Sequence, residues 1–428
     1  MSGPRRTPLA EREHAPTQGD GDQTENEETG GPRRDADASV LLAGLRRRVA
    51  RLTQHLSQGQ RNAVFMLGVL LIGALTVLGL QQWGNAQQGG HTATNPQATS
   101  TTASTTASTS GSPQTRPAQA KEFFLPDQQP GLMYPVLDAQ GNLWMGEMSD
   151  NALARLNTHT GVVTTWAPPH GENNIMITVI DSQGRVWFTE QAANYIGRFD
   201  PATQRFTSYP LPAVNGQGAG PMGLAFDAAG KLWFTETNTS RVGRLDPATG
   251  VIQTWSVPRP PTTQQSLPYE LTITPDGMIW YGYLTGGSVG RFDPATQRAT
   301  LYRTPDPDAQ ILGMTSDAQG HVWFTELNTG KIGEIDSASG VVREFTVPNT
   351  LGNPANLYGI ATTHDGGVWF ASAGANAAVR YIPATNTFTF YQLARQQSTP
   401  YGLTSGPDGR LWLTTDGSPA NYVAAITP

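Results

Sequence analysis

The chain of 428 residues contains no cysteine, and only 14% of its residues are charged. The absence of cysteine excludes disulfide scaffolds, cysteine-ligated zinc sites and cysteine nucleophiles. With a net charge of −6, the sequence also lacks the basic surplus typical of nucleic-acid-binding proteins, so we expect no nucleic-acid partner. Glycine and proline are instead abundant, at 47 and 32 residues. Their number indicates many turns and argues against a helical bundle.

The first 61 residues divide into two segments. Residues 1–37 carry almost no apolar side chains, so they cannot bury enough surface to offset the entropy of ordering, and we expect a disordered tail. In residues 38–61, apolar side chains recur at spacings of three and four with arginines between them, at Leu42, Leu45, Val49, Leu52 and Leu56. This pattern predicts an amphipathic juxtamembrane helix.

A long apolar run follows this helix. Between residues 63 and 80 the only polar side chain is that of Thr76, and Trp83 lies just beyond. A run of 18 such residues is long enough to cross the hydrocarbon core of a bilayer, so residues 62–83 are a predicted transmembrane helix. Arginines precede the run, whereas no lysine or arginine follows it before Arg116. The positive-inside rule then predicts a single-pass protein of the cell membrane, with a cytoplasmic N-terminus and an extracytoplasmic C-terminal part.

Residues 84–120 consist mainly of serine, threonine, alanine, glycine, glutamine and proline. No apolar periodicity is present in this segment, and it includes the run Thr-Ala-Ser-Thr-Thr-Ala-Ser-Thr. Such a composition is typical of a flexible linker, which would connect the membrane to the folded part that follows.

Residues 121–428 repeat one pattern seven times. A tryptophan returns at intervals of 43 to 47 residues, at Trp144, Trp187, Trp233, Trp280, Trp323, Trp369 and Trp412. The third unit shows four short apolar runs, at 222–226, 232–236, 242–245 and 252–257, separated by turn sequences such as Asp-Pro-Ala-Thr-Gly. Four strands in each of seven such units predict an all-β fold, a seven-bladed β-propeller.

The two ends of the repeated region complement each other. The seventh unit contains three expected strands, around Leu403, Trp412 and Val423, and then the sequence stops. The segment 122–125 resembles the fourth strand of other units, so we expect it to complete the last blade. This arrangement would close the ring and leave no open sheet edge between its first and last blades.

One mouth of the central channel is the predicted binding site. The first strand of a blade begins on the same face where the second strand ends, so residues eleven before the tryptophan and three or four after it gather there. The first of these sets consists of Met133, Met176, Met222, Tyr269, Leu312, Tyr358 and Tyr401. The second contributes Glu147, Glu190, Glu236, Tyr283 and Glu326, and four after the seventh tryptophan is Asp416. Together they predict a pocket for a partly apolar ligand with a polar or cationic group. Alternatively, each repeated glutamate accepts hydrogen bonds from the turn that follows it.

The repeat resembles a known family. The pattern Pro-x-Gly-Leu, then Asp-x-x-Gly-x-Leu-Trp-Phe-Thr-Glu, then Asn-x-Ile-Gly-Arg is similar to that of the virginiamycin B lyase (streptogramin lyase) propellers, over all of 121–428. The resemblance implies opening of a cyclic depsipeptide by elimination at its ester, with histidines in acid/base roles and a magnesium ion. It also implies histidines where this chain has Tyr358 and Tyr401, and glutamates where it has Thr399 and Asp416.

The remaining histidines do not replace the missing ones. Four lie in the repeated region, and none has a partner at metal or triad spacing, so we expect surface positions for His159, His170, His321 and His364. Our leading hypothesis is therefore a membrane-anchored propeller that binds a small molecule, a peptide or a cell-envelope component. The alternatives are a magnesium-dependent lyase or hydrolase of the streptogramin B type, with Asp416 as a metal ligand, and a structural or signalling scaffold.

Overall fold

The computed structural model describes residues 112–125, 131–148, 150–171, 174–261, 263, 266–351, 356–416 and 421–428. The predicted tail, amphipathic helix and transmembrane helix, and most of the predicted linker, lie outside these residues. Within the described ranges, no helix is long and apolar enough to span a bilayer.

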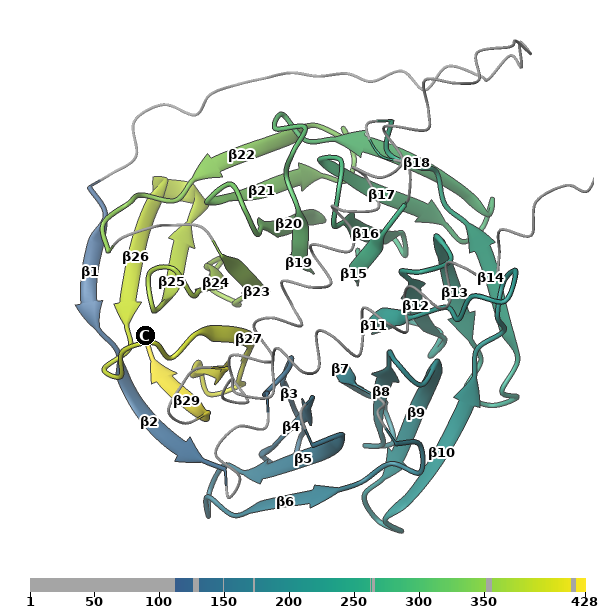
Figure 1. The fold of residues 1–428 in the computed structure, drawn as a ribbon. Coiled ribbons are helices and arrows are strands. Elements are labelled where there is room, and N and C mark those ends of the chain that lie inside the picture. The colour runs from purple at the N-terminus through teal and green to yellow at the C-terminus, as the bar shows by residue number, and fades with distance from the viewer. Residues whose placement is uncertain are drawn as a thin grey trace, which may run out of the picture. The chain divides into compact units, whose positions relative to one another are not determined.

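The described residues form seven sheets, antiparallel except for one added outer strand, in which the strands follow one another from the channel outward (Figure 1). Blade one contains β3 (Val136–Leu137), β4 (Asn142–Glu147), β5 (Ala152–Asn157) and β6 (Val163–Trp166). Blade two contains β7 (Ile175–Ile180), β8 (Val186–Glu190), β9 (Tyr195–Asp200) and β10 (Arg205–Pro210). Blade three contains β11 (Pro221–Phe226), β12 (Leu232–Glu236), β13 (Arg241–Leu245) and β14 (Ile252–Ser256). Blade four contains β15 (Pro268–Ile273), β16 (Ile279–Tyr283), β17 (Ser288–Asp293) and β18 (Arg298–Arg303).

The remaining three blades continue the order. Blade five contains β19 (Ile311–Ser316), β20 (His321–Glu326), β21 (Lys331–Asp336) and β22 (Val342–Thr346). Blade six contains β23 (Leu357–Thr362), β24 (Val368–Ser372), β25 (Ala377–Ile382), a 3₁₀ turn (Pro383–Thr385), β26 (Thr387–Gln392) and β1 (Gln114–Pro117). Blade seven contains β27 (Pro400–Ser405), β28 (Leu411–Thr415), β29 (Tyr422–Thr427) and β2 (Gln119–Phe124). The seven-bladed β-propeller predicted from the repeat is confirmed.

The N-terminal strand closes the ring as expected. β2 pairs antiparallel with β29 over six residue pairs, among them Phe123 with Val423. The Phe123 side chain is buried, and its ring lies 5.8 Å from that of Trp412. Blade seven is therefore built from both ends of the propeller, and unfolding its outer strand exposes part of the core.

The boundary between linker and propeller differs from the prediction. Residues 114–117 form β1, a fifth strand that pairs in parallel with β26 of blade six, and β2 already begins at Gln119. Both strands start within the 84–120 segment that composition assigns to a flexible linker. All four β1 side chains are exposed, so the strand is held by main-chain hydrogen bonds to a sheet edge. Such pairing needs no apolar side chains, which is why composition does not reveal it.

The repeat tryptophans pack between neighbouring blades. Each of the seven is at least 98% buried. In blades one, two, three and five the indole Nε1 donates to an aspartate six residues earlier, as from Trp233 to Asp227 at 2.8 Å. This layer fixes the spacing of the blades and so the width of the channel.

Candidate functional site

A repeated bulge directs side chains into the channel. In blades two to seven the register between the first and second strands shifts, so that Pro268 pairs with Tyr283 but Leu271 pairs with Tyr281. One extra residue on the first strand leaves the ladder at this point, and a bulge of this kind re-aims the side chains around it. Tyr269 and Glu270 lie between the two registered pairs. Figure 1 shows these first strands surrounding the centre of the propeller.

The structure brings the predicted ring of methionines and tyrosines together. One buried cluster contains Met133, Met176, Met222, Tyr269, Leu312 and Tyr401, and the partly buried Tyr358 packs against it. Residues four after the tryptophan, such as Met148, Leu284 and Leu327, belong to the same cluster. Side chains from all seven blades therefore meet in the channel, although they are far apart in the sequence.

The repeated glutamates are buried at the ends of the second strands. Glu147, Glu190, Glu236 and Glu326 are each at least 97% buried. The Thr239 hydroxyl donates to the Glu236 carboxylate, and Thr329 makes the same contact with Glu326. The residues three after the tryptophan end the second strands, and the residues four after it lie just beyond them. For Glu236 and Glu326 the structure thus matches the alternative in which the carboxylate binds the following turn.

Burial has a measurable consequence for these carboxylates. It raises the pKa of Glu236 above its ordinary value, against the hydrogen bond from Thr239. It raises the pKa of Glu326 to about 8, with the nearby charge of Glu344 adding to the effect and Thr329 and Lys331 opposing it. Glu326 is therefore mostly protonated at neutral pH.

Tyr283 lies away from the channel. Its hydroxyl donates to the Pro258 carbonyl at 2.6 Å, and its ring packs edge-on against Tyr281 at 5.5 Å. Both rings belong to the cluster formed with blade three, which includes Trp233. We therefore no longer count Tyr283 as a ligand-binding candidate.

Glu270 is the channel residue that the sequence analysis missed. The position ten before each tryptophan is glycine in blades three, five, six and seven, at Gly223, Gly313, Gly359 and Gly402. A Cβ atom on Gly223 would lie 2.7 Å from the Tyr269 carbonyl, so in these blades the inner strands approach too closely for a side chain. Blades one, two and four carry Tyr134, Ile177 and Glu270 there instead. In blade four the repeated pattern Pro-x-Gly-Leu is replaced by Pro268-Tyr-Glu-Leu271. This departure from the repeat could have identified Glu270 in the sequence.

The Glu270 carboxylate lies among phenol rings. Its Oε2 accepts a hydrogen bond from the Met314 amide at 3.1 Å. Burial raises the pKa of Glu270 well above its ordinary range, and the Met314 bond lowers it only in part. After the effect of burial, the Glu270 charge is the next cause that raises the pKa of Tyr134 and of Tyr269. The Glu270 charge therefore acts on tyrosines of blades one and four.

Three tyrosine rings stack along one side of this space. The Tyr401 ring lies 4.5 Å from that of Tyr358 and 5.4 Å from that of Tyr134, the latter in an edge-on arrangement. Burial raises the pKa of all three phenols above the ordinary value of 10.0. At neutral pH the three rings are thus uncharged.

Asp416 approaches the tyrosines from blade seven. Its amide donates to the Thr399 carbonyl at 3.0 Å, which joins two of the positions that the family resemblance had singled out. Burial raises the pKa of Asp416 to about 6, against a hydrogen bond from Asn421. Its charge in turn raises the pKa of Tyr358 and that of Tyr401. The structure therefore brings Tyr358, Tyr401 and Asp416 together, with Thr399 beside Asp416.

These residues do not fit a magnesium ion. In the part of the chain that the structure describes, no three His, Cys, Asp or Glu side chains are placed to hold a metal together. The groups facing Asp416 are neutral phenols, whereas Mg²⁺ is usually bound through one or two carboxylates and several waters. Asp416 alone is a poor site for the ion that the resemblance implies.

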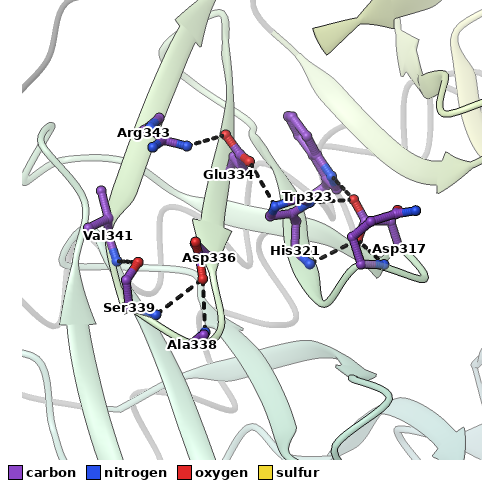
Figure 2. A network of polar contacts seen from close by, with 10 residues as sticks. Asp317, His321, Trp323, Glu334, Asp336, Ala338, Ser339, Val341 and Arg343 are labelled. Carbon is purple, nitrogen blue, oxygen red and sulfur yellow. Dashed lines mark hydrogen bonds and ion pairs between the residues drawn. The ribbon is translucent and has the colours of Figure 1, made fainter. Parts of the chain in front are cut away.

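The histidines are not part of the channel cluster. His170 stacks on Tyr195, with ring centroids 3.9 Å apart. His321 was expected at the surface without a partner at metal or triad spacing, and about a third of its side chain is exposed. Its Nδ1 lies 2.9 Å from Asp317 Oδ2, and its Nε2 lies 3.8 Å from Glu334 Oε1, as Figure 2 shows. His321 begins β20, whereas Glu326 ends it, so this network lies at the other end of the strand from the channel mouth.

Comparisons with known proteins agree with this architecture. The family model described as the virginiamycin B lyase family matches residues 118–423, and the chain belongs to that family. A solved streptogramin B lyase structure is 28% identical, with a TM-score of 0.65 over 72% of this chain and 96% of its own. Virginiamycin B lyase from Staphylococcus aureus is 26% identical, with a TM-score of 0.65 over 72% of this chain and 99% of its own. A catalytically inactive His-to-Ala variant of that enzyme with quinupristin has the same identity, coverage and TM-score. No curated protein matches the sequence.

Proposed function

We propose that this propeller binds a small-molecule, peptide or cell-envelope ligand at the mouth of its channel and does not open cyclic esters. The observation that carries the proposal is the tyrosine group itself. Tyr358 and Tyr401 occupy positions where the family resemblance implies histidines, and burial raises the pKa of both phenols. A general base is effective when its pKa lies near the working pH, so neither phenol is suited to take a proton at neutral pH.

The channel is suited to binding by its composition. Pockets for small ligands are mostly apolar, with a few converging polar groups that fix orientation. Met133, Met176, Met222 and Leu312 supply the apolar wall. Glu270, Asp416 and the phenols supply the polar groups. The arrangement is asymmetric although the fold is repeated, as a single ligand would require.

Family membership and one further observation favour a second candidate, the magnesium-dependent lyase. Burial raises the pKa of Asp416 to about 6, a value within the range of a general base. In that reaction Asp416 would take a proton next to the ester that is broken. We rank this candidate second because Thr399 lacks the carboxylate that the resemblance implies, and because the donors around Asp416 do not fit the ion.

Incubation of the purified chain with a B-type streptogramin and magnesium separates the two candidates. We expect no linearised product by mass spectrometry under conditions in which an active family member converts its substrate. Loss of general acid/base catalysis typically costs about 10²–10⁴-fold in rate. A variant with Tyr358→His, Tyr401→His and Thr399→Glu is the matched comparison. Turnover by the unaltered chain at the rate of an active member would refute the binding proposal.

We further propose that one transmembrane helix, within residues 62–83, anchors the propeller outside the cytoplasm. The uncharged run from Ala63 to Leu80 and the arginines before it support this topology. Protease added to intact cells should release the propeller by cutting between residues 84 and 111. Release only after the cells are permeabilised would show that the orientation is the reverse.

A further inference from the structure

Among the described residues, the channel holds two carboxylates that have no basic partner. Several other carboxylates do pair with lysine or arginine, as Glu344 does with Lys331 at 2.8 Å and Glu122 with Arg395 at 2.7 Å. None of these ion pairs involves Glu270 or Asp416. Both residues are partly buried, and buried charges usually pair with a cation or bind a metal. The channel therefore has the charge of a cation site.

The side chains near these carboxylates include several tyrosine rings. The Tyr401 side chain is buried, and the Glu270 and Asp416 charges both contribute to its raised pKa. Its ring contacts those of Tyr134 and Tyr358. The Tyr134 side chain is buried, and its hydroxyl has no hydrogen-bond partner among the described residues. An unpaired buried hydroxyl costs free energy unless a ligand group or water meets it.

This combination selects one class of cation. A divalent metal needs six or more oxygen ligands or a cluster of histidines and carboxylates, and the described residues offer no such group. An organic ammonium ion instead binds to the faces of aromatic rings, because their quadrupoles attract a weakly hydrated positive charge. Met133 and Met222, which belong to the same cluster, add a polarisable wall for the methyl groups of such an ion.

We propose that the channel binds an organic ammonium group against the rings of Tyr134, Tyr358 and Tyr401, with Glu270 and Asp416 as its counter-charges. This inference rests on the proposed binding function and names its ligand class. A free amine and a lysine side chain of a peptide share the required chemistry.

Proton release accompanies binding at such a site. The ionisable groups facing Glu270 are Tyr134, Tyr269 and Tyr401, and those facing Asp416 are Tyr358 and Tyr401. Burial raises the pKa of both carboxyls, so the empty site holds protons that a cation displaces. Affinity therefore increases with pH until both carboxyls are ionised without the ligand.

Isothermal titration calorimetry of the full chain in a neutral detergent provides the test. The probes are choline, tetramethylammonium, Nα-acetyl-lysinamide and 3,3-dimethylbutanol, which is the neutral isostere of choline. We expect at least one ammonium probe to bind saturably, at least tenfold more tightly than 3,3-dimethylbutanol. The choline and lysinamide arms distinguish a small amine from a peptide lysine. Titration in buffers of different ionisation enthalpy measures the protons released.

Four variants locate the site. Glu270→Gln and Asp416→Asn should each weaken ammonium binding about tenfold or more and reduce proton release. Tyr401→Leu removes a ring and should weaken binding similarly, whereas Tyr134→Phe keeps the ring and should change affinity less than threefold. Glu236→Gln is the matched control, since it alters a buried carboxyl with a raised pKa outside the channel, and should leave binding unchanged. Thermal unfolding of each variant verifies its fold.

The outcomes separate this inference from the proposal on which it rests. Absence of saturable binding by all three ammonium probes overturns the inference, as does equal binding of 3,3-dimethylbutanol. If neutral glycans or cyclic peptides nevertheless stabilise the chain and Tyr401→Leu abolishes that effect, the proposed binding function stands. Streptogramin turnover would instead refute that function itself. Should Glu270→Gln fail to fold, Asp416→Asn and Tyr401→Leu still decide the question.

Discussion

The layer between the blades and the lining of the channel are built from the same strands, yet they treat polar groups in different ways. In the blade layer, Thr235 Oγ1 accepts from the Gly223 amide at 2.8 Å and donates to the Tyr269 carbonyl of the next blade. Thr325 and Thr414 make the equivalent bonds in blades five and seven. In the channel, the Tyr134 hydroxyl has no partner among the described residues, and Glu270 has no cation there.

The blade layer is not fully satisfied either. The Trp233 indole donates to Asp227, whereas the equivalent Trp280 and Trp412 Nε1 atoms have no partner among the described residues. What distinguishes the channel is that its unpaired buried groups, the Tyr134 and Tyr401 hydroxyls, lie on neighbouring rings. Because buried polar groups are normally satisfied, these hydroxyls are where a channel ligand would complete the structure.

Deletion of residues 114–124 would test the closed ring most severely. Loss of β1 and β2 exposes the edge of β29 and removes Phe123 from Trp412. We expect the melting temperature to fall by more than about 10 °C, since removing a buried aromatic side chain alone costs about 3–5 kcal/mol. The control deletes only 114–117, whose side chains are exposed, and should cost a few degrees. Equal melting curves for the long deletion and the intact chain would contradict closure by β2.

Replacing one carboxyl in the channel and one in the blade layer compares how the stability of the fold depends on pH in the two regions. The folded pKa of Asp416 is about 6, above its ordinary value of 3.8, so its contribution to stability is present below pH 3.8 and is lost as the pH rises through 6. For Glu326 the corresponding loss extends from 4.5 to about 8. We therefore expect the free energy of unfolding to depend less on pH in both variants. The change should fall between about pH 4 and 6 for Asp416→Asn, and between 4.5 and about pH 8 for Glu326→Gln.

Two pKa units correspond to roughly 3 kcal/mol, which is an upper bound for the Asp416 effect because that side chain is partly exposed. Chemical denaturation at a series of pH values measures both profiles. A saturating ammonium ligand should change the profile of the Glu326→Gln variant and of the intact chain, but much less that of Asp416→Asn. Identical ligand effects in the two variants would show that the regions do not differ in the way described.

The smallest effect is expected at the network around His321. About a third of this side chain is exposed, and its bonds to Asp317 and Glu334 lie away from the channel (Figure 2). Exposed ion pairs contribute about 0–1 kcal/mol, so His321→Gln should change the free energy of unfolding by less than 1 kcal/mol. Binding of any channel ligand should be unchanged. A loss of binding in this variant would show that the network is coupled to the channel.

The sequence predicted the number and order of the blades. It did not predict which side chain at each repeated position contacts the channel. The tryptophan period predicted seven blades, and the missing fourth strand predicted the role of 122–125. The direction of the strands also predicted that the residues eleven before each tryptophan lie in one cluster. The sequence analysis assigned Glu147, Glu190, Glu236 and Glu326 to the same mouth, and for Glu236 and Glu326 the structure shows a hydrogen bond from a threonine of the following turn.

The sequence by itself determined the number of blades and their closure, since a fixed period of strands and turns allows few architectures. Only the tertiary structure decided which polar groups meet. A bulge on each first strand turns Tyr269 and Glu270 toward the channel, and the close approach of neighbouring strands leaves room there only for glycine in four blades. Tyr134, Glu270, Tyr401 and Asp416 are separated by up to 282 positions in the chain, and only the closed ring brings them to one space.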